Sequence, residues 1–349
     1  MQRWLGWMLL AGLAAAAHAD PAPPAAPASA DPPAAAPAEP LPPEAPAEAP
    51  AEPASGAATG RPRKTVATVV AVPVPSALDG RSLRALTDDP VVGRASRVDG
   101  DERKGLVAFT FDDGPNPETT PAVIDALEKY GIPATFFIVT NRIAGKHGEH
   151  SRRLLQRELD AGFLVGSHSV SHVNLKHAAG GQLDREIDAS IRALAVQAHR
   201  PIGMFRPPYG ALSPAGRVRL KKLGLTEVLW SVDTLDWKAH DPERLRRKVV
   251  SMIKHDEGGV VLMHDVKSIT AKVIAEVLDD LEAENCARLA GNREPILPVS
   301  LHYFLRNGKA PRELPEPVVQ RTAAYKAALP ERCAKRPPPP ERADRHAAK

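Results

Sequence analysis

The chain has 349 residues, a formal net charge of +4 and 43% hydrophobic residues. Its length would allow two domains, but residues 20–60 are almost entirely Ala, Pro and Glu and cannot bury enough apolar surface to offset the entropy of ordering them. The modest charge, without aromatic residues interleaved among the basic ones, argues against nucleic acid as a partner. Basic clusters such as Arg217 to Lys222 are solvated helix faces, or a surface that attracts anionic cell-envelope polymers.

The first nineteen residues have the pattern of a signal peptide. Arg3 supplies a positive charge, residues 4–16 form an apolar stretch, and Ala17-His18-Ala19 is a small-x-small cleavage site. The apolar stretch is shorter than the ~20 residues that a bilayer span needs, which favours cleavage over an uncleaved anchor. We therefore expect a periplasmic or secreted protein with no stable membrane span after cleavage.

The composition predicts one folded domain between two tails. The expected segments are a signal peptide (1–19), a disordered Ala/Pro-rich linker (20–64), a lead-in segment (65–103), a folded domain (104–308) and a polar, Pro-rich C-terminal tail (309–349).

Within the folded part, short apolar runs alternate with helical patterns. The predicted strands cover 106–111, 134–139, 163–166, 203–205, 226–231 and 259–263, followed by a short apolar segment at 296–299. The predicted helices cover 119–129, 152–160, 183–197, 214–223, 242–254 and 271–285. This alternation implies parallel pairing with right-handed crossovers. We expect an α/β fold, a distorted (β/α) barrel of about seven parallel strands rather than an open doubly wound sheet, with disordered Pro-rich tails.

Five polar clusters lie at or just beyond the ends of predicted strands, where barrel enzymes gather their active-site residues. They are Thr110 to Pro115 (TFDDGP), His168 to His172 (HSVSH), Arg206 to Gly210 (RPPYG), Asp233 to Trp237 (DTLDW) and Leu262 to Asp265 (LMHD). Each alone has an ordinary structural interpretation. The first could be a helix-capping turn, and the third a rigid surface turn.

The chemistry of the clusters also fits a metal site. Two imidazoles four residues apart can converge on one ion, and a carboxylate from elsewhere would complete a two-His, one-carboxylate site with open positions for water. The adjacent carboxylates Asp112 and Asp113 could divide the work, one holding the metal and one acting as a base.

Taken in order, the five clusters closely resemble the motifs of the polysaccharide deacetylase family (the NodB homology domain, carbohydrate esterase family 4). That family carries TFDDG, H-[ST]-x-x-H, R-x-P-[YF]-G, D-x-x-D-W and L-x-H. All five occur here without a substitution at a defining position, between about Lys104 and Leu305. The resemblance covers neither tail.

The resemblance implies a role for each motif residue. Asp113, His168 and His172 would hold a divalent metal ion, with zinc as the default. Asp112 would be the general base, with Arg206 as its partner, and the backbone N–H of Tyr209 would help to hold the oxyanion. His264 would be the general acid, oriented by Asp236. Trp237 and Leu262 would wall the pocket for the acetyl methyl group.

The implied function is hydrolysis of N-acetyl groups on an N-acetylglucosamine-containing polysaccharide, with peptidoglycan as the first choice of substrate. Two alternatives stay open. One is an esterase that removes O-acetyl groups, for example from xylan, because the same machinery would serve. The other is a non-catalytic glycan-binding module.

The chain has two cysteines, Cys286 near the end of the last predicted helix and Cys333 in the predicted tail. An oxidising compartment favours a bridge between them, which would tie the tail to the barrel. The alternative is one buried and one mobile thiol.

Overall fold

The computed structural model describes residues 82–100, 103–145 and 148–336. The predicted signal peptide, the linker and residues 65–81 of the lead-in segment lie outside the described residues.

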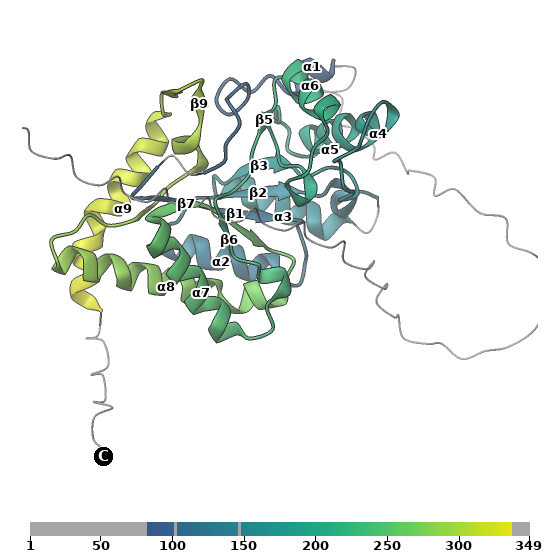
Figure 1. Ribbon diagram of the computed structural model, residues 1–349. Helices are drawn as coiled ribbons and strands as arrows, with labels where there is room; N and C mark the ends of the chain where they lie inside the picture. Colours follow the sequence, from purple (N-terminus) through teal and green to yellow (C-terminus); the bar gives the residue numbers. More distant parts are fainter. Residues whose placement is uncertain (1–81, 101–102, 146–147, 337–349) are drawn as a thin grey trace, which may run out of the picture. The chain divides into compact units, whose positions relative to one another are not determined.

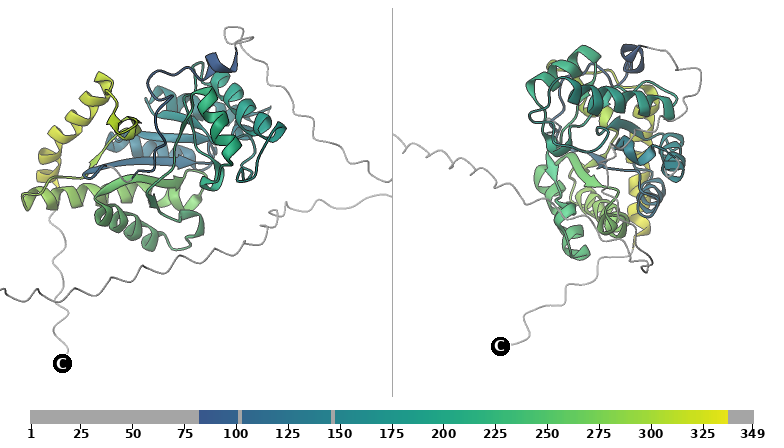
Figure 2. Two further views of the ribbon diagram at one scale, coloured as in Figure 1. Left: turned by 45° about the horizontal axis from the view of Figure 1, so that its top comes forward. Right: turned by 90° about the vertical axis from the view of Figure 1, so that its right-hand side faces the viewer.

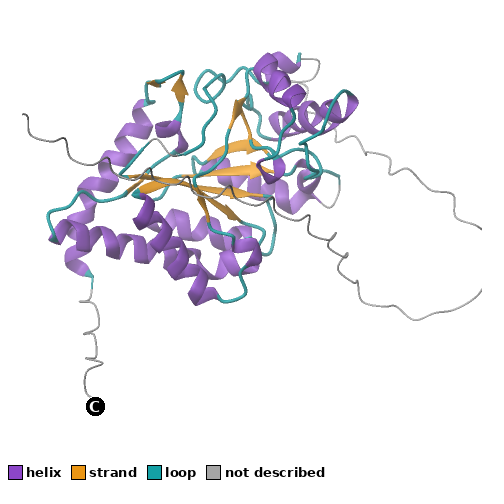
Figure 3. Cartoon of the chain, viewed as in Figure 1, coloured by secondary structure: helices purple, strands orange, loops and turns teal. Residues whose placement is uncertain are grey.

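Eight strands form the central sheet, shown in orange in Figure 3. They are β1 (Leu106–Asp112), β2 (Ala134–Ile138), β3 (Leu164–Ser167), β4 (Met204–Phe205), β5 (Thr226–Glu227), β6 (Val232–Asp233), β7 (Gly258–His264) and β8 (Leu297–Pro298). The order is β5-β4-β3-β2-β1-β7-β6, with β8 also paired to β1. Every pairing within this sheet is parallel. The predicted α/β fold is confirmed.

The two edges of the sheet come close together because one short segment joins them. The Val228 N–H donates to Phe205 of β4, whereas the Ser231 N–H donates to Val260 of β7. Four extended residues reach only about 14 Å, so the sheet must curl into a distorted half-barrel. The single strand that we predicted over residues 226–231 is therefore wrong. Only its first two residues belong to a strand, β5, and the rest connects to β6 at the opposite edge.

Helices follow the strands and cover the outside of the sheet (Figure 1). The longer ones are α2 (Thr120–Tyr130), α3 (Glu149–Asp160), α5 (Ala189–Gln197), α6 (Pro214–Leu223), α7 (Pro242–Asp256) and α8 (Ser268–Ala290). The short ones are α1 (Leu83–Leu86), α4 (Gly181–Leu183), η1 (Thr140–Ile143), the π-helical turn η3 (Asp184–Asp188), η4 (Pro208–Gly210), η5 (Asp236–Lys238) and η6 (Leu301–Phe304). None of the helices in the described part of the chain has the length and apolarity to cross a bilayer.

The C-terminal segment differs from the irregular tail that we predicted. After a small hairpin of β9 (Arg306–Asn307) and β10 (Ala310–Pro311), residues Glu316–Lys335 form the helix α9, which packs on α8 (Figure 2). Two prolines lie in this helix: Pro317 falls in the first turn, where proline is well tolerated, and Pro330 lies inside it. Tyr325 and Leu329 are buried on one face of α9, and the predicted bridge between Cys286 and Cys333 is present.

Candidate active site

The inner face of the curled sheet determines which side chains meet. Side chains along a strand alternate between faces. Ala108, Met204 and Val260 belong to the inner apolar cluster, so Asp112, Arg206 and His264 at the ends of the same strands share the inner face. Asp112 and His264 are also register partners on neighbouring strands. Three of the predicted catalytic residues therefore converge at one end of the half-barrel.

Arg206 is fully buried and is the partner of Asp112. Its Nη1 donates to Asp112 Oδ1 at 2.8 Å and to the Thr110 hydroxyl at 2.8 Å. Its Nη2 donates to the Leu229 carbonyl at 2.9 Å, and the guanidinium lies 4.2 Å from the centre of the Phe137 ring. Burial raises the pKa of Asp112, and the charge of Arg206 opposes that rise. The result is a proton-accepting carboxylate fixed in one orientation.

His168 and His172 face Asp113 just beyond the strand ends. The Nδ1 of His168 donates to the Arg206 backbone carbonyl at 2.7 Å, which leaves its Nε2 as an acceptor. Burial lowers the pKa of His168 to about 3, so the ring is neutral near pH 7. Asp113 Oδ1 lies 3.6 Å from His168 Nε2 and 3.2 Å from His172 Nε2. Asp112 Oδ2 is also 3.6 Å from His168 Nε2.

These three side chains fit a divalent cation. Asp113 Oδ1 is buried and has no hydrogen-bond donor among the described residues, although it faces ring nitrogens whose lone pairs need a positive partner. The three ligand atoms lie within 4.8 Å of one another. Two ligands about 2.1 Å from a tetrahedral ion stand roughly 3.4 Å apart, which is close to the observed spacings.

His264 and Asp236 form a second hydrogen-bonded pair. His264 Nδ1 donates to Asp236 Oδ1 at 2.7 Å, and the His264 backbone N–H donates to Asp236 Oδ2 at 2.7 Å. Burial disfavours the charged ring. The bond to Asp236 and the charges of Asp236, Asp112 and Asp113 outweigh this effect and raise the pKa of His264 to about 9. The ring is therefore protonated at neutral pH and can donate a proton.

The remaining predicted residues surround this centre less closely. Tyr209 is 64% exposed, and its ring lies 4.7 Å, centre to centre, from the His172 ring. Trp237 is partly exposed beside Lys238, and its backbone N–H donates to Asp236. Leu262 is buried in β7. The acetyl pocket that we predicted from Trp237 and Leu262 stays a prediction.

Known proteins are similar to this chain in sequence. Residues 99–228 match the family model described as polysaccharide deacetylase. A chitooligosaccharide deacetylase of Azorhizobium caulinodans is 35% identical over 176 residues, which cover 50% of this chain and 80% of that protein. The chain belongs to the polysaccharide deacetylase family.

Other members of the family match over different lengths. The peptidoglycan-N-acetylglucosamine deacetylase PgdA of Listeria monocytogenes is 31% identical over 225 residues, 64% of this chain. That match spans less than half (45%) of the Listeria protein. The solved family 4 carbohydrate esterase from Streptomyces lividans, in complex with acetate, is 31% identical with a TM-score of 0.45 over 52% of this chain and 89% of that one.

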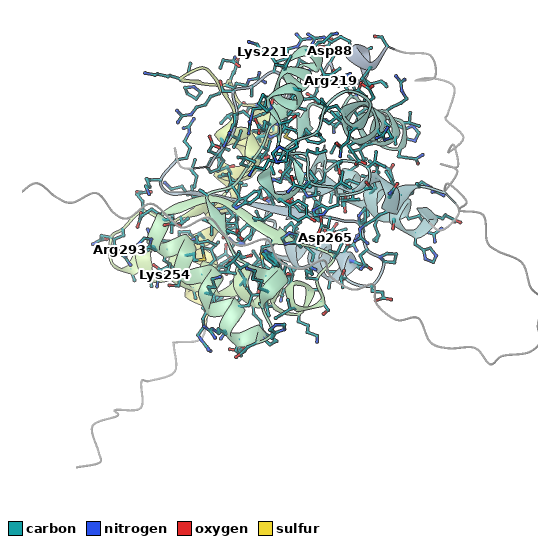
Figure 4. All side chains as sticks on the ribbon, turned by 45° about the vertical axis from the view of Figure 1, so that its right-hand side comes forward. Asp88, Arg219, Lys221, Lys254, Asp265 and Arg293 are labelled. Atoms are coloured by element: carbon teal, nitrogen blue, oxygen red, sulfur yellow. A yellow bond between two sulfur atoms is a disulfide. The ribbon has the colours of Figure 1, made fainter. Side chains whose placement is uncertain are left out.

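The sequence assigned no role to several polar residues that support the polysaccharide deacetylase motifs. The Thr270 hydroxyl donates to Asp236 Oδ2 at 2.6 Å. Asp265, labelled in Figure 4, is buried where the first and fifth motifs meet and accepts a hydrogen bond from the Thr120 hydroxyl. Glu186 contacts the loop between the two histidines. Asp265 closes the fifth cluster but was given no role there, whereas Thr270 and Glu186 lie in helical segments without any local signal.

Proposed function

We propose that this protein is a metal-dependent polysaccharide N-deacetylase, which hydrolyses the amide of N-acetylglucosamine units to an amine and acetate. The observation that supports this function is a single arrangement at adjacent strand ends. It combines a buried carboxylate–arginine pair, three convergent ligand side chains and a protonated histidine–aspartate pair. The family membership supports the same reaction class.

The proposed roles follow from the partners of each group. A divalent ion held by Asp113, His168 and His172, with zinc as the first candidate, would supply Lewis-acid chemistry at the acetyl carbonyl and at water. Asp112 accepts the proton of the attacking water, and Arg206 keeps its carboxylate directed toward the site. The Tyr209 backbone N–H donates to the oxygen that becomes negatively charged.

His264 completes the reaction as the general acid. Its Nδ1 is bound to Asp236, so Nε2 is free to donate its proton to the departing amine nitrogen. Asp236 itself is held by Thr270. The ring therefore has both the charge and the orientation that the step requires. Trp237 and Leu262 are proposed to line the pocket for the acetyl methyl group.

Peptidoglycan is the substrate that we propose first. The Listeria relative is named for that polymer, and the Azorhizobium relative for chitooligosaccharides. A bridge between Cys286 and Cys333 is typical of an oxidising compartment. Together with the signal-peptide pattern of residues 1–19, it supports action in the periplasm or outside the cell.

The test is mass spectrometry of acetate loss from peptidoglycan, chitin oligomers and acetylated xylan, with the wild type and His168→Ala. We expect deacetylated glucosamine units from peptidoglycan with the wild type. We expect neither product nor tightly bound metal with His168→Ala. Acetate loss from xylan alone would instead identify an O-acetyl esterase. Binding of glycan without any product would identify a non-catalytic module.

A further inference from the structure

The backbone between the two histidine ligands is held in a disfavoured conformation. Ser169 has a φ of 71° and His172 a φ of 58°, both in the left-handed region that side chains with a Cβ rarely adopt. Such a conformation persists only where surrounding contacts hold it. Because these residues lie between or at the ligands, whatever holds the loop also determines where the imidazole rings point.

The carbonyl groups of this loop are held by the segment that follows β2. The Ser169 carbonyl accepts from the Thr140 N–H, and the Val170 carbonyl accepts from the Asn141 N–H, each at 3.1 Å. These bonds hold one side of the loop. They leave its N–H groups to be satisfied from elsewhere.

Glu186 accepts hydrogen bonds from two of the four N–H groups of residues 169–172. Its Oε2 accepts from the N–H groups of Val170 at 3.1 Å and Ser171 at 3.0 Å, and its Oε1 accepts from the Ser171 hydroxyl at 2.7 Å. The His172 N–H is bound by Ser169 Oγ within the loop. One side chain thus binds two of the three residues between the histidines of the H-x-x-x-H motif.

The position of Glu186 suits this role. It lies in η3, between α4 and α5, and is 8% exposed, so its carboxylate has little freedom to turn away. π-Helical turns of this kind are frequent at functional sites. With both oxygens engaged by the loop, Glu186 is not itself one of the three convergent ligands.

We propose that Glu186 is a positioning residue for the metal site. By holding Val170 and Ser171 it fixes the separation and direction of the His168 and His172 rings, and thereby determines the affinity for the divalent ion. This inference rests on the metal site described under the proposed function. Side chains that orient metal ligands typically contribute about 10–100-fold in metal affinity.

The experiment is a zinc titration of the metal-free full chain against a chromophoric chelator. For Glu186→Ala we expect the dissociation constant to rise by about 10–100-fold. Glu186→Gln should rescue most of the affinity, because its amide oxygen can still accept from both N–H groups while the Ser171 hydroxyl turns to accept from the amide nitrogen. If Glu186→Ala does not fold, Glu186→Asp, whose shorter side chain cannot reach all three donors, takes its place.

Glu282→Ala is the matched control. Glu282 is also nearly buried and makes ion pairs, with Arg332 and Arg336, but it joins α8 to α9. Its loss should lower Tm without changing zinc affinity. Wild-type affinity in Glu186→Ala, or in Glu186→Asp as its substitute, overturns the proposal. If the wild type itself binds no zinc, or His168→Ala binds it equally well, the metal site fails and the role of Glu186 fails with it.

Discussion

Asp112 and Asp113 are adjacent in sequence, yet their surroundings differ in a way that supports the separate roles proposed for them. Asp112 ends β1 on the inner face and has one oxygen bound to Arg206. Asp113 follows with a φ of 76°, which turns its carboxylate toward the two histidines, and its Oδ1 lacks any donor among the described residues. Distance alone does not separate the two residues, because each has an oxygen 3.6 Å from His168 Nε2. Their hydrogen-bond partners distinguish them, because Asp112 is bound by Arg206 and Asp113 Oδ1 has no such donor among the described residues.

We therefore predict that Asp112→Asn keeps the metal and loses turnover. The amide cannot take a proton from water, and general bases contribute about 10²–10⁴-fold to the rate. Asp113→Asn should instead weaken zinc binding. Zinc titration and kcat measured on both variants separate the two effects. Loss of metal in Asp112→Asn with retention in Asp113→Asn would mean that the two roles are reversed.

Gly114 is required for a packing reason at the same site. A Cβ at this position would overlap both carboxylate oxygens of the buried Asp265. Asp265 is short and bound to Thr120, so it cannot easily move away. We predict that Gly114→Ala lowers the free energy of unfolding by about 1–3 kcal/mol, as overpacking does, and weakens zinc binding by displacing Asp113.

Urea unfolding and zinc titration check the Gly114 prediction. Gly181→Ala is the control, because its Cβ would meet only the flexible end of Arg185 at an ordinary contact distance. It should leave both measurements close to the wild type. Wild-type stability and zinc affinity in Gly114→Ala would show that the site has room that the packing does not suggest.

At the scale of elements, the sequence predicts the repeating strand–helix units well, because their apolar runs end at clear signals. The helix over residues 214–223 is observed with the predicted bounds. It has Ser213 as its N-cap, a proline in its first turn and Gly224 in the left-handed conformation after it. The prediction of one strand over residues 226–231 was wrong because an apolar run carries no information about which edge of a sheet it joins.

The site residues that lie within short sequence motifs could be predicted. All five motifs lie at strand ends as expected, and the inner-face positions of Asp112, Arg206 and His264 follow from strand periodicity. Glu186 and Thr270 could not be found in this way. Their importance comes from hydrogen bonds to residues far along the chain, which depend on tertiary packing.

The helix α9 is joined to the barrel by the bridge between Cys286 and Cys333, 47 residues apart. By the loop-entropy argument, opening a loop of this size costs about 4 kcal/mol of unfolding free energy at most. We predict that Cys286→Ser with Cys333→Ser lowers stability toward that limit and makes the segment before α9 sensitive to protease. Turnover should be unchanged, because neither cysteine lies in a motif.

Urea unfolding, limited proteolysis and an activity assay test the bridge together. The ion pair of Arg336 with Asp279 also joins α9 to α8, and Arg336→Gln is the control that weakens the same contact without opening the loop. It should have a smaller effect, as exposed ion pairs typically contribute ~0.2–1 kcal/mol. Full protease resistance of the double serine variant would mean that packing alone holds α9.

At the scale of the whole molecule, backbone strain gathers at one end of the half-barrel. Among the described residues, five of the nine non-glycine residues with positive φ lie in the motifs: Asp113, Ser169, His172, Tyr209 and Leu235. Each non-glycine residue held in the left-handed backbone conformation lowers the stability of the fold by roughly 1–2 kcal/mol. The apolar layers on both faces of the sheet stabilise the fold against this cost, so core packing and site geometry are coupled.

His302 links the stability of the molecule to pH from outside this site. It lies in η6, is 8% exposed and is hydrogen-bonded through Nδ1 to the Ser300 hydroxyl. Burial lowers the pKa of His302 to about 4, assisted by the charge of Arg200 and opposed by that of Asp89. An unfolded histidine has a pKa near 6.5. Between about pH 6.5 and pH 4, His302 therefore binds a proton in the unfolded chain but stays neutral in the folded protein.

The contribution of neutral His302 to the stability of the fold is therefore complete above about pH 6.5 and is lost as the pH falls toward 4. We predict that the wild type loses about 3 kcal/mol more than His302→Gln between pH 7 and pH 4. Asp265, whose pKa burial raises to about 7, acts in the opposite direction, but it is present in both proteins and its effect cancels.

Urea unfolding between pH 7 and pH 4, with chelator present to exclude metal, measures the difference between the wild type and His302→Gln. His255→Gln, which alters an exposed side chain on α7, should follow the wild type. Parallel pH profiles for the wild type and His302→Gln would show that His302 is protonated equally in the folded and unfolded states.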